Sequence, residues 1–212
     1  MRSHKSLAFQ KPATRAWFER TFAGPTPVQT KAFGAIANGE STLLLAPTGS
    51  GKTLAAFLVA IDRLLFESPP PPKQRCRVLF VSPIKALAFD VEKNLRAPLA
   101  GISAEAVAMG VPVHDVRVDL RTGDTTPADR ARILRHPPDI LVTTPESLYL
   151  MLTSGARSVL ASVDTVIVDE IHSFVATKRG AHFFLSLERL EALRPVGSRP
   201  LPMRAKPPCI TS

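Results

Sequence analysis

Short runs of apolar residues alternate with longer amphipathic stretches along this chain. Five runs are rich in β-branched or aliphatic residues and are typical of strands: 42–45, 78–81, 116–120, 140–142 and 166–168. Most are continuous rather than alternating, as expected of strands buried on both faces of a parallel sheet. Apolar residues recur with helical spacing from Leu54 to Leu65, and residues 86–96 and 179–193 also predict helices. This order predicts an α/β fold, a mostly parallel sheet with helices on both faces.

Two segments depart from this pattern. Residues 68–73 contain four consecutive prolines and predict an exposed loop, because proline neither continues a helix nor joins a strand ladder. The segment 194–212 contains five prolines and has no apolar periodicity. We therefore expect a basic N-terminal segment (1–17), one folded domain (18–193) and a Pro-rich basic tail (194–212).

The composition excludes several classes of protein. The 212 residues are 45% hydrophobic and 21% charged, which excludes wholesale disorder. No apolar run approaches the roughly 20 residues that a membrane span requires. Cys76 and Cys209 are too few for a disulfide scaffold or a zinc site, and no apolar stretch typical of a secretory signal follows the first residues. We expect a cytoplasmic protein with reduced thiols and no membrane partner.

The net charge of +9 suggests nucleic acid as a partner, but its distribution weakens that inference. Residues 1–31 contain six Lys and Arg residues against one acid, and residues 194–212 contain four against none. The middle of the chain is electrically balanced. A solvated basic tail explains this excess as well as a binding face does, so nucleic-acid binding must be argued from motifs.

The segment 46–53 (Ala-Pro-Thr-Gly-Ser-Gly-Lys-Thr) lies between a predicted strand and a predicted helix and is typical of a phosphate-binding loop. Small residues let backbone N–H groups cradle phosphate oxygens, and the helix N-terminus adds positive potential. Lys52 can reach the β- and γ-phosphates of ATP, and the Thr53 hydroxyl can ligate Mg²⁺. The other predicted contacts of this loop are Thr48, Gly49, Ser50 and Gly51.

Two acidic residues, Asp169 and Glu170, follow the last predicted strand at its carboxyl end, where sites in α/β sheets form. Asp169 can hold Mg²⁺, usually through water, and Glu170 can polarise an attacking water, so the pair favours hydrolysis. Alone, such a pair is more often a solvated turn or a helix cap. The phosphate-binding loop upstream reverses that interpretation.

With both motifs present, the chain resembles the superfamily 2 helicases, and most closely the large helicase-related (Lhr) proteins of bacteria and archaea. The resemblance covers about residues 18–193. It rests on segments in the family's order: 25–29 (Q motif), 46–53 (motif I), 82–88 (motif Ia), 121–125, 143–148, 169–172 (a DExH-type motif II), 178–182 and 185–190. It implies the first of two RecA-like P-loop NTPase domains of an ATP-dependent helicase, which acts on DNA or RNA–DNA hybrids and is associated with DNA repair.

The resemblance also implies roles for individual residues. Gln29 would read the adenine of ATP, and His172 would couple the nucleotide site to the second domain, although an ordinary hydrogen-bonded histidine is an equal alternative. Phosphates of single-stranded DNA or RNA would be held without reading bases. The residues at the matching positions are Lys85, Arg121, Gly123, Thr144 and Glu146.

Beyond residue 193 the sequence departs from the family's pattern. A Ser-Ala-Thr motif is expected about 30 residues after motif II, and residues 196–202 do not contain it. We expect the second RecA-like domain and its catalytic arginines to be missing, as in a truncated or frame-shifted product. Such a chain would hydrolyse ATP slowly and unwind nothing alone. Two alternatives stay open: a nucleotide- and nucleic-acid-binding module without turnover, and another P-loop enzyme such as a kinase.

Overall fold

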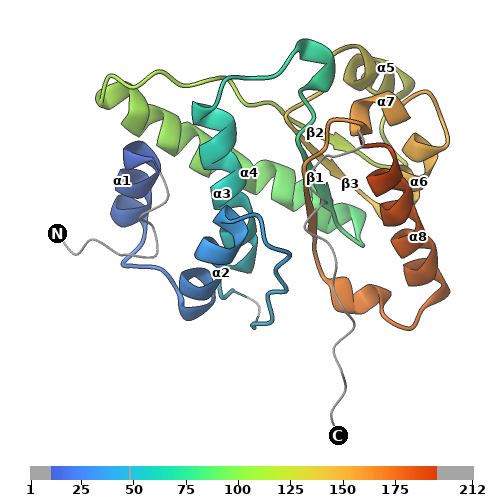
Figure 1. The fold of residues 1–212 in the computed structure, drawn as a ribbon, viewed down its shortest axis with the longest axis horizontal. Coiled ribbons are helices and arrows are strands. Elements are labelled where there is room, and N and C mark those ends of the chain that lie inside the picture. The colour runs from blue at the N-terminus through green and yellow to red at the C-terminus, as the bar shows by residue number, and fades with distance from the viewer. Residues whose placement is uncertain (1–10, 48, 195–212) are drawn as a thin grey trace, which may run out of the picture.

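A parallel four-stranded sheet forms the centre of the protein. The computed structural model describes residues 11–47 and 49–194. The strands are β1 (Val78–Val81), β2 (Val118–Arg121), β3 (Ile140–Thr143) and β4 (Thr165–Val168), arranged in the order β2-β3-β1-β4 (Figure 1). Every pairing is parallel. The two central strands are buried along their whole length, which explains their unbroken apolar sequence.

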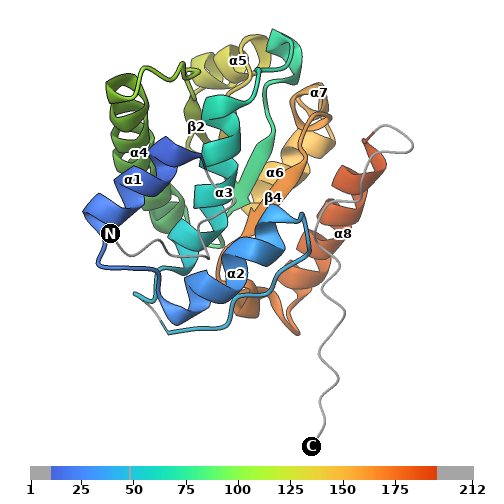
Figure 2. The same cartoon turned by 60° about the vertical axis from the view of Figure 1, so that its left-hand side comes forward.

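Helices cover both faces of this sheet, as expected (Figure 2). One apolar cluster packs α1–α4 against Val78, Phe80, Ile140 and Val142. The other packs α6–α8 against the alternate residues Leu79, Val81 and Leu141. Successive strand side chains point to opposite faces, so the same short strands supply both halves of the core. The helical elements are α1 (Pro12–Thr21), α2 (Pro27–Ala37), α3 (Lys52–Phe66), η2 (Pro72–Gln74), α4 (Lys85–Ala108), α5 (Pro127–Arg135), α6 (Pro145–Leu152), α7 (Arg157–Leu160), η3 (Ile171–Phe174) and α8 (Lys178–Ala192).

The helix starts follow local sequence rules. Proline lies in the first turn of α1, α2, α5 and α6, where its missing N–H costs no hydrogen bond. The hydroxyls of Thr26, Thr126 and Thr177 cap α2, α5 and α8 by accepting a backbone N–H. The helix expected over 86–96 is longer than predicted, because Ile102 and Ala106 of α4 continue its buried face. None of the described helices is long and apolar enough to cross a membrane.

The strand predicted over 42–45 does not form. These residues have no regular secondary structure, no described strand pairs with them, and β4 is an edge strand of the described sheet. Leu43 and Leu45 are exposed, and only Leu44 packs against the core. An apolar run becomes a strand only when a neighbour accepts its backbone hydrogen bonds, and this requirement is invisible in the run itself.

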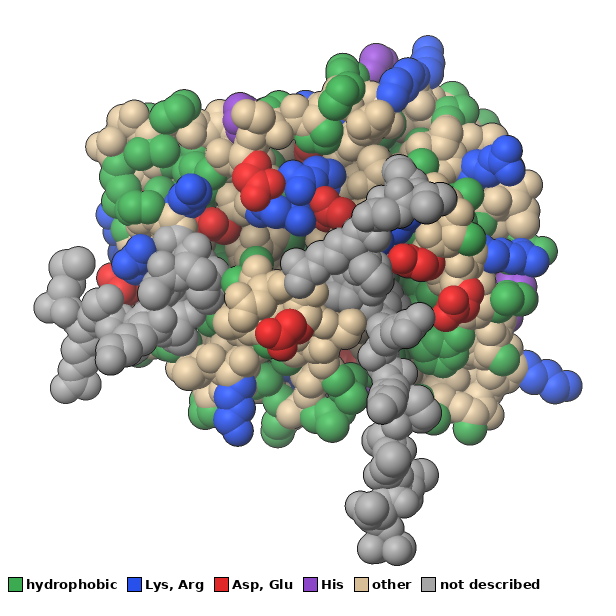
Figure 3. Space-filling view, viewed as in Figure 1, with side chains coloured by type: hydrophobic (Ala, Val, Ile, Leu, Met, Phe, Trp, Pro, Cys, Tyr) green, Lys and Arg blue, Asp and Glu red, His purple; other side chains and the backbone are tan. Residues whose placement is uncertain are grey.

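The carboxyl ends of the four strands meet at one edge of the sheet, because the strands are parallel. Arg121 ends β2, Thr144 follows β3, Ser82 follows β1 and Asp169 follows β4. This edge therefore collects residues from four distant parts of the sequence. On the face seen in Figure 3, basic and acidic side chains are interspersed, in keeping with the balanced charge of the middle of the chain.

Candidate functional site

The phosphate-binding loop is folded by two glycines in the left-handed region. Gly49 has φ 80° and Gly51 has φ 81°, and α3 begins immediately afterwards at Lys52. A Cβ atom on Gly51 would also lie 2.4 Å from Nε2 of Gln29, so a larger residue here would adopt a strained backbone conformation and displace the Gln29 amide. The loop thus delivers its backbone to the N-terminus of α3, which favours anions. Thr48, another expected contact, lies outside the described residues.

The side chains of this loop fit a phosphate group. Lys52 curls over the loop, where its ammonium group donates to the carbonyl oxygens of Ala46 and Pro47. The Ser50 hydroxyl is buried and has no hydrogen-bond partner among the described residues. A buried, unsatisfied hydroxyl is costly, and a phosphate oxygen held by this loop would satisfy it. Thr53, on the first turn of α3, is exposed and accessible to a metal ion.

Gln29 is buried at 4% exposure and ties α2 to the phosphate-binding loop. Its Oε1 accepts the Thr26 N–H at 2.9 Å, and its Nε2 donates to the Gly51 carbonyl at 3.2 Å. A glutamine amide has two donor hydrogens and two acceptor positions. Each end of this amide therefore has capacity for one more hydrogen bond. The geometry gives Gln29 a structural role that sequence reasoning did not foresee.

The acidic pair lies at the end of β4, on a strained backbone. Glu170 adopts the left-handed conformation with φ 47°, and its carboxylate lies 3.3 Å from Nδ1 of His172. Burial raises the pKa of the Asp169 carboxyl, and the neighbouring Glu170 charge raises it further. The backbone N–H of Glu170 and the charges of Lys52 and His172 oppose that rise. The fold thus brings Lys52 within electrostatic range of Asp169, although they are far apart in sequence. Non-glycine residues in this backbone region are concentrated at functional sites.

The five residues expected to contact a nucleic acid occupy the ends of β1, β2 and β3. Lys85 begins α4 and forms an ion pair with Asp124, at 2.7 Å between Nζ and Oδ1. Thr144 is buried at 3% exposure between β3 and α6. Glu146 forms an ion pair with Arg179 at 2.6 Å. Burial is the largest single influence and raises the pKa of Glu146, but the hydrogen bonds from Arg179, from its own backbone N–H and from Thr144, together with the charge of Arg179, outweigh it, and the net direction is downward.

Arg179 connects three elements of this edge, and sequence reasoning assigned it no role. Its Nη2 donates to the Pro83 carbonyl at 2.7 Å, and its guanidinium lies 5.7 Å from the centre of the Phe174 ring. With the Glu146 ion pair, it joins the loop after β1, the start of α6 and η3. The sequence contained one indication of this role: the segment 178–182, which includes Arg179, matches the family pattern, although the match alone suggests no function.

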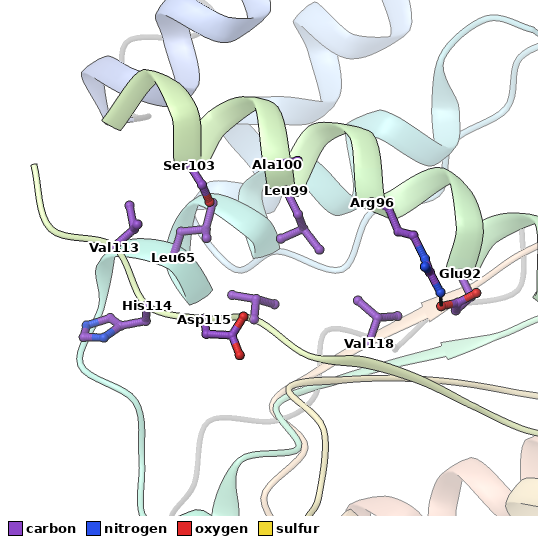
Figure 4. Close-up of a pocket in the computed structure, with 11 residues that line it drawn as sticks. Leu65, Glu92, Arg96, Leu99, Ala100, Ser103, Val113, His114, Asp115 and Val118 are labelled. Carbon is purple, nitrogen blue, oxygen red and sulfur yellow. Dashed lines mark hydrogen bonds and ion pairs between the residues drawn. The ribbon is translucent and has the colours of Figure 1, made fainter. Parts of the chain in front are cut away.

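A hollow of about 600 Å³ lies away from this edge, between α4 and the segment before β2 (Figure 4). Leu65, Leu99 and Val116 form part of its wall. At one end, Arg96 and Glu92 form an ion pair with each other at 2.8 Å. Because the hollow lies beside the residues that precede β2, it is at the opposite end of that strand from Arg121 and plays no part in the candidate site.

The described residues include no group of three or more His, Cys, Asp or Glu side chains that could hold a metal ion. A tightly chelated metal is therefore not indicated in that part of the chain. A magnesium ion bound to nucleotide phosphates needs only one or two protein ligands. Thr53 and Asp169 match that requirement in chemical type.

The amino-acid sequence of the chain is similar to those of known helicases. The sequence pattern of the DEAD/DEAH box helicase family matches residues 26–204. The chain is 59% identical to the Lhr helicase/probable uracil glycosylase of Mycolicibacterium smegmatis, over 85% of this chain and 12% of that protein. It is 44% identical to the ATP-dependent helicase Lhr-Core of Methanocaldococcus jannaschii, over 87% of this chain and 22% of that protein. The chain thus spans well under a third of the length of these curated relatives.

The solved structures agree with the sequence matches. The structure of Mycobacterium smegmatis helicase Lhr bound to ssDNA and AMP-PNP superposes with a TM-score of 0.87 at 54% identity, over 93% of this chain and 24% of that chain. The DEAD-box helicase Mss116, at 19% identity and a TM-score of 0.73 over 93% of this chain and 38% of that chain, shares the fold. The RecA-like architecture expected from the sequence is confirmed.

Proposed function

The chain belongs to the DEAD/DEAH box helicase family, and from this premise we propose that it is the ATP-binding RecA-like domain of an Lhr-type, ATP-dependent nucleic-acid helicase. The observation that carries the proposal is the meeting of two motifs. The phosphate-binding loop at the start of α3 and the acidic pair after β4 are brought within electrostatic range of each other. ATP hydrolysis requires the groups that hold the phosphates to lie next to the groups that activate the attacking water.

In the proposed site, ATP lies over the loop at the start of α3. The backbone around Gly49 and Gly51, with the hydroxyls of Thr48 and Ser50, holds the phosphate oxygens. Lys52 neutralises the β- and γ-phosphates, and Gln29 uses its remaining hydrogen-bonding capacity for adenine. Magnesium, when bound, supplies positive charge between the phosphate oxygens.

Three side chains complete the proposed chemistry. Thr53 and Asp169 are the protein groups that would hold the ion, Asp169 through water. Glu170 orients and polarises the attacking water. His172, in contact with Glu170, transmits the state of this site to a second domain.

The proposed nucleic-acid path crosses the ends of β2, β3 and β1. The Lhr relative bound to ssDNA supports a single-stranded ligand. Hydroxyls, backbone N–H groups and a few cations at such loops contact phosphates and leave base sequence unread. The residues we assign to this path are Lys85, Arg121, Gly123, Thr144 and Glu146, with Glu146 acting through Arg179 and Lys85 acting through the loop that it holds by its ion pair with Asp124. From the family resemblance of its motifs, we propose DNA or RNA–DNA hybrids as its substrate and DNA repair as its role, and from its composition a cytoplasmic location.

The proposed domain comprises residues 18–193, preceded by a basic segment (1–17) and followed by a Pro-rich basic tail (194–212). Unwinding is proposed only for this domain together with a second RecA-like domain. Strand separation requires two domains that open and close on ATP, and arginines from the second domain stabilise charge on the γ-phosphate. The 212-residue chain alone should therefore turn over ATP slowly.

Glu170→Gln provides the test that separates an ATPase from a module that binds nucleotide without turnover. The amide keeps the size of the carboxylate but loses its charge, so phosphate release in the presence of oligothymidylate should fall by about a hundredfold. Glu188→Gln removes the same charge from an exposed position on α8 and should leave the rate unchanged. A rate unaltered by Glu170→Gln would overturn the assignment and favour the module without turnover.

A further inference from the structure

Three basic side chains converge on the loop that follows β2. Arg121 ends this strand, and Gly123 follows two residues later. Arg130, on α5, donates from Nη2 to the Gly123 carbonyl at 2.9 Å. The Lys85 ammonium lies against the same glycine, since a Cβ atom built there would be 3.6 Å from Nζ. The fold therefore brings cations from α4 and α5 to one glycine, two residues after Arg121, whose charge interacts with that of Arg130.

Most of the acidic side chains near this loop are already engaged. Asp124 accepts two hydrogen bonds from Lys85, at 2.7 and 2.9 Å. Asp119 and Asp129 both pair with Arg132 on the outer side of α5. Within the described ranges, neither Arg121 nor Arg130 forms an ion pair with a carboxylate. Lys85 is thus neutralised, and two guanidinium groups keep their charge.

The described residues leave both guanidinium groups with unused donors, on a buried residue at Arg121 and a half-buried one at Arg130. The Arg121 residue is 9% exposed, and no hydrogen bond from its side chain to a described residue is formed. The Nε atom of Arg130 is buried and has no partner either. Burial lowers the pKa of Arg121, and the neighbouring charge of Arg130 lowers it further. A buried donor without an acceptor, as at Nε of Arg130, and two like charges without a counter-ion both destabilise the fold, and an anionic ligand at this place would offset the repulsion between the two charges.

The location of this pair indicates which anion it would bind. Arg121 is paired in register with Thr143, and Thr144 follows directly, so the loop adjoins the proposed nucleic-acid path. A guanidinium group matches the geometry of a phosphate with two parallel hydrogen bonds. The contact with Gly123 uses only one of the five N–H donors of Arg130. The remaining donors on its two Nη atoms are available to a ligand.

We propose that Arg130 is a phosphate-binding residue, and that with Arg121 it forms a two-arginine site for two neighbouring backbone phosphates of a single strand, one phosphate for each guanidinium group. This inference rests on the proposed function and assigns a binding residue outside the segments that resemble helicase motifs. In it, Lys85 is held by Asp124 and positions the loop, whereas the two arginines supply the unpaired positive charge.

The salt dependence of oligonucleotide binding tests this assignment. Fluorescence anisotropy with a labelled oligothymidylate, measured on the 212-residue chain over a range of NaCl concentrations, gives the slope of log affinity against log salt. Each phosphate contact to a single strand contributes about 0.7 to that slope. Arg130→Gln should reduce the magnitude of this slope by about 0.7. The ratio of wild-type to variant affinity should therefore be about fivefold larger at 0.1 M salt than at 1 M salt.

Arg132→Gln is the matched control, because it removes the same charge from the same helix. Arg132 is already paired with Asp119 and Asp129, so its substitution should leave the slope unchanged. Arg130→Lys keeps the charge but not the planar fork, and should retain the slope while lowering affinity. Thermal melting of each variant shows whether the loop still folds.

The outcomes separate this inference from the proposed function. If Arg130→Gln leaves the slope intact while Thr144→Ala weakens binding, the two-arginine site is wrong and the nucleic-acid path stands. Equal losses from Arg130→Gln and Arg132→Gln would reveal a general charge effect, which also overturns the site. If the wild-type chain binds no oligothymidylate at low salt, both proposals fail.

Discussion

Gly180→Ala should destabilise the protein, although alanine is the better helix former. Gly180 is the third residue of α8, and its N–H donates to the capping hydroxyl of Thr177 at 2.9 Å. A Cβ atom at this position would lie 1.7 Å from the Phe174 carbonyl oxygen. An ordinary contact begins at 3.4 Å, so α8 and η3 would have to separate by about 1.7 Å.

Two opposing terms determine the magnitude. Replacing glycine by alanine inside a helix stabilises it by about 1 kcal/mol. Overpacking against a rigid neighbour costs about 1–3 kcal/mol or more. Phe174 is 1% exposed, and the atoms that the new Cβ would meet are its backbone atoms rather than a flexible side chain. The upper end of that energy range therefore applies. We expect the free energy of unfolding to fall by about 2 kcal/mol, and the melting temperature by roughly 4–8 °C.

Gly34→Ala supplies the matched comparison. Gly34 lies inside α2, and an added Cβ would meet nothing within 4 Å. This variant should gain up to about 1 kcal/mol from helix propensity alone. Urea unfolding followed by circular dichroism measures both variants on one scale. If Gly180→Ala is as stable as Gly34→Ala, the close packing of α8 on η3 is refuted.

Three further substitutions test individual features. Burial raises the pKa of Asp169, so the ionised carboxylate destabilises the fold above that pKa. Asp169→Asn should therefore be more stable than wild type at pH 7. This gain should vanish below about pH 3.9, where the carboxyl is protonated in both the folded and the unfolded state. Urea titrations at both pH values check this, and an equal gain at each contradicts it. Ala176 has φ 58°, so Ala176→Gly should stabilise by about 1 kcal/mol, and a lower urea midpoint would count against that conformation. Lys52→Ala should lower the affinity for ATP, measured by calorimetry, at least tenfold. Lys31→Ala, which removes an exposed lysine on α2, is the control and should leave that affinity unchanged. Equal ATP affinities of the two variants would disprove the contact between Lys52 and the phosphates.

Sequence patterns predicted those elements that are set by local periodicity. The runs at 78–81, 140–142 and 166–168 form β1, β3 and β4, and the periodic stretches after residues 51 and 177 form α3 and α8. The run at 42–45 is also apolar but is mostly leucine, and it has no neighbour among the described strands. The difference lies in hydrogen-bond partners contributed by distant segments, which a local pattern does not contain.

In the candidate site too, some features were predicted from the sequence and others depend on distant segments of the chain. The types and order of the motif residues predicted that Lys52 and Asp169 would share a site, and in the structure Lys52 begins α3 while Asp169 follows β4. The ion pairs of Lys85 with Asp124 and of Glu146 with Arg179 were not predicted. They join residues 39 and 33 positions apart, and only the folded chain shows that these charges neutralise each other.

This neutralisation changes how the excess positive charge should be interpreted. On the described strand-end edge, Arg121 and Arg130 are the cations that we assign to phosphate, which predicts a salt slope of about −1.4 for single-stranded ligands. Basic residues are concentrated in 1–31 and 194–212 instead. A measured slope several times steeper would mean that these terminal segments contact phosphates as well. A slope near −1.4 would mean that they are solvated, and that the edge binds a strand mainly through hydroxyls and backbone donors, whose contacts are insensitive to salt.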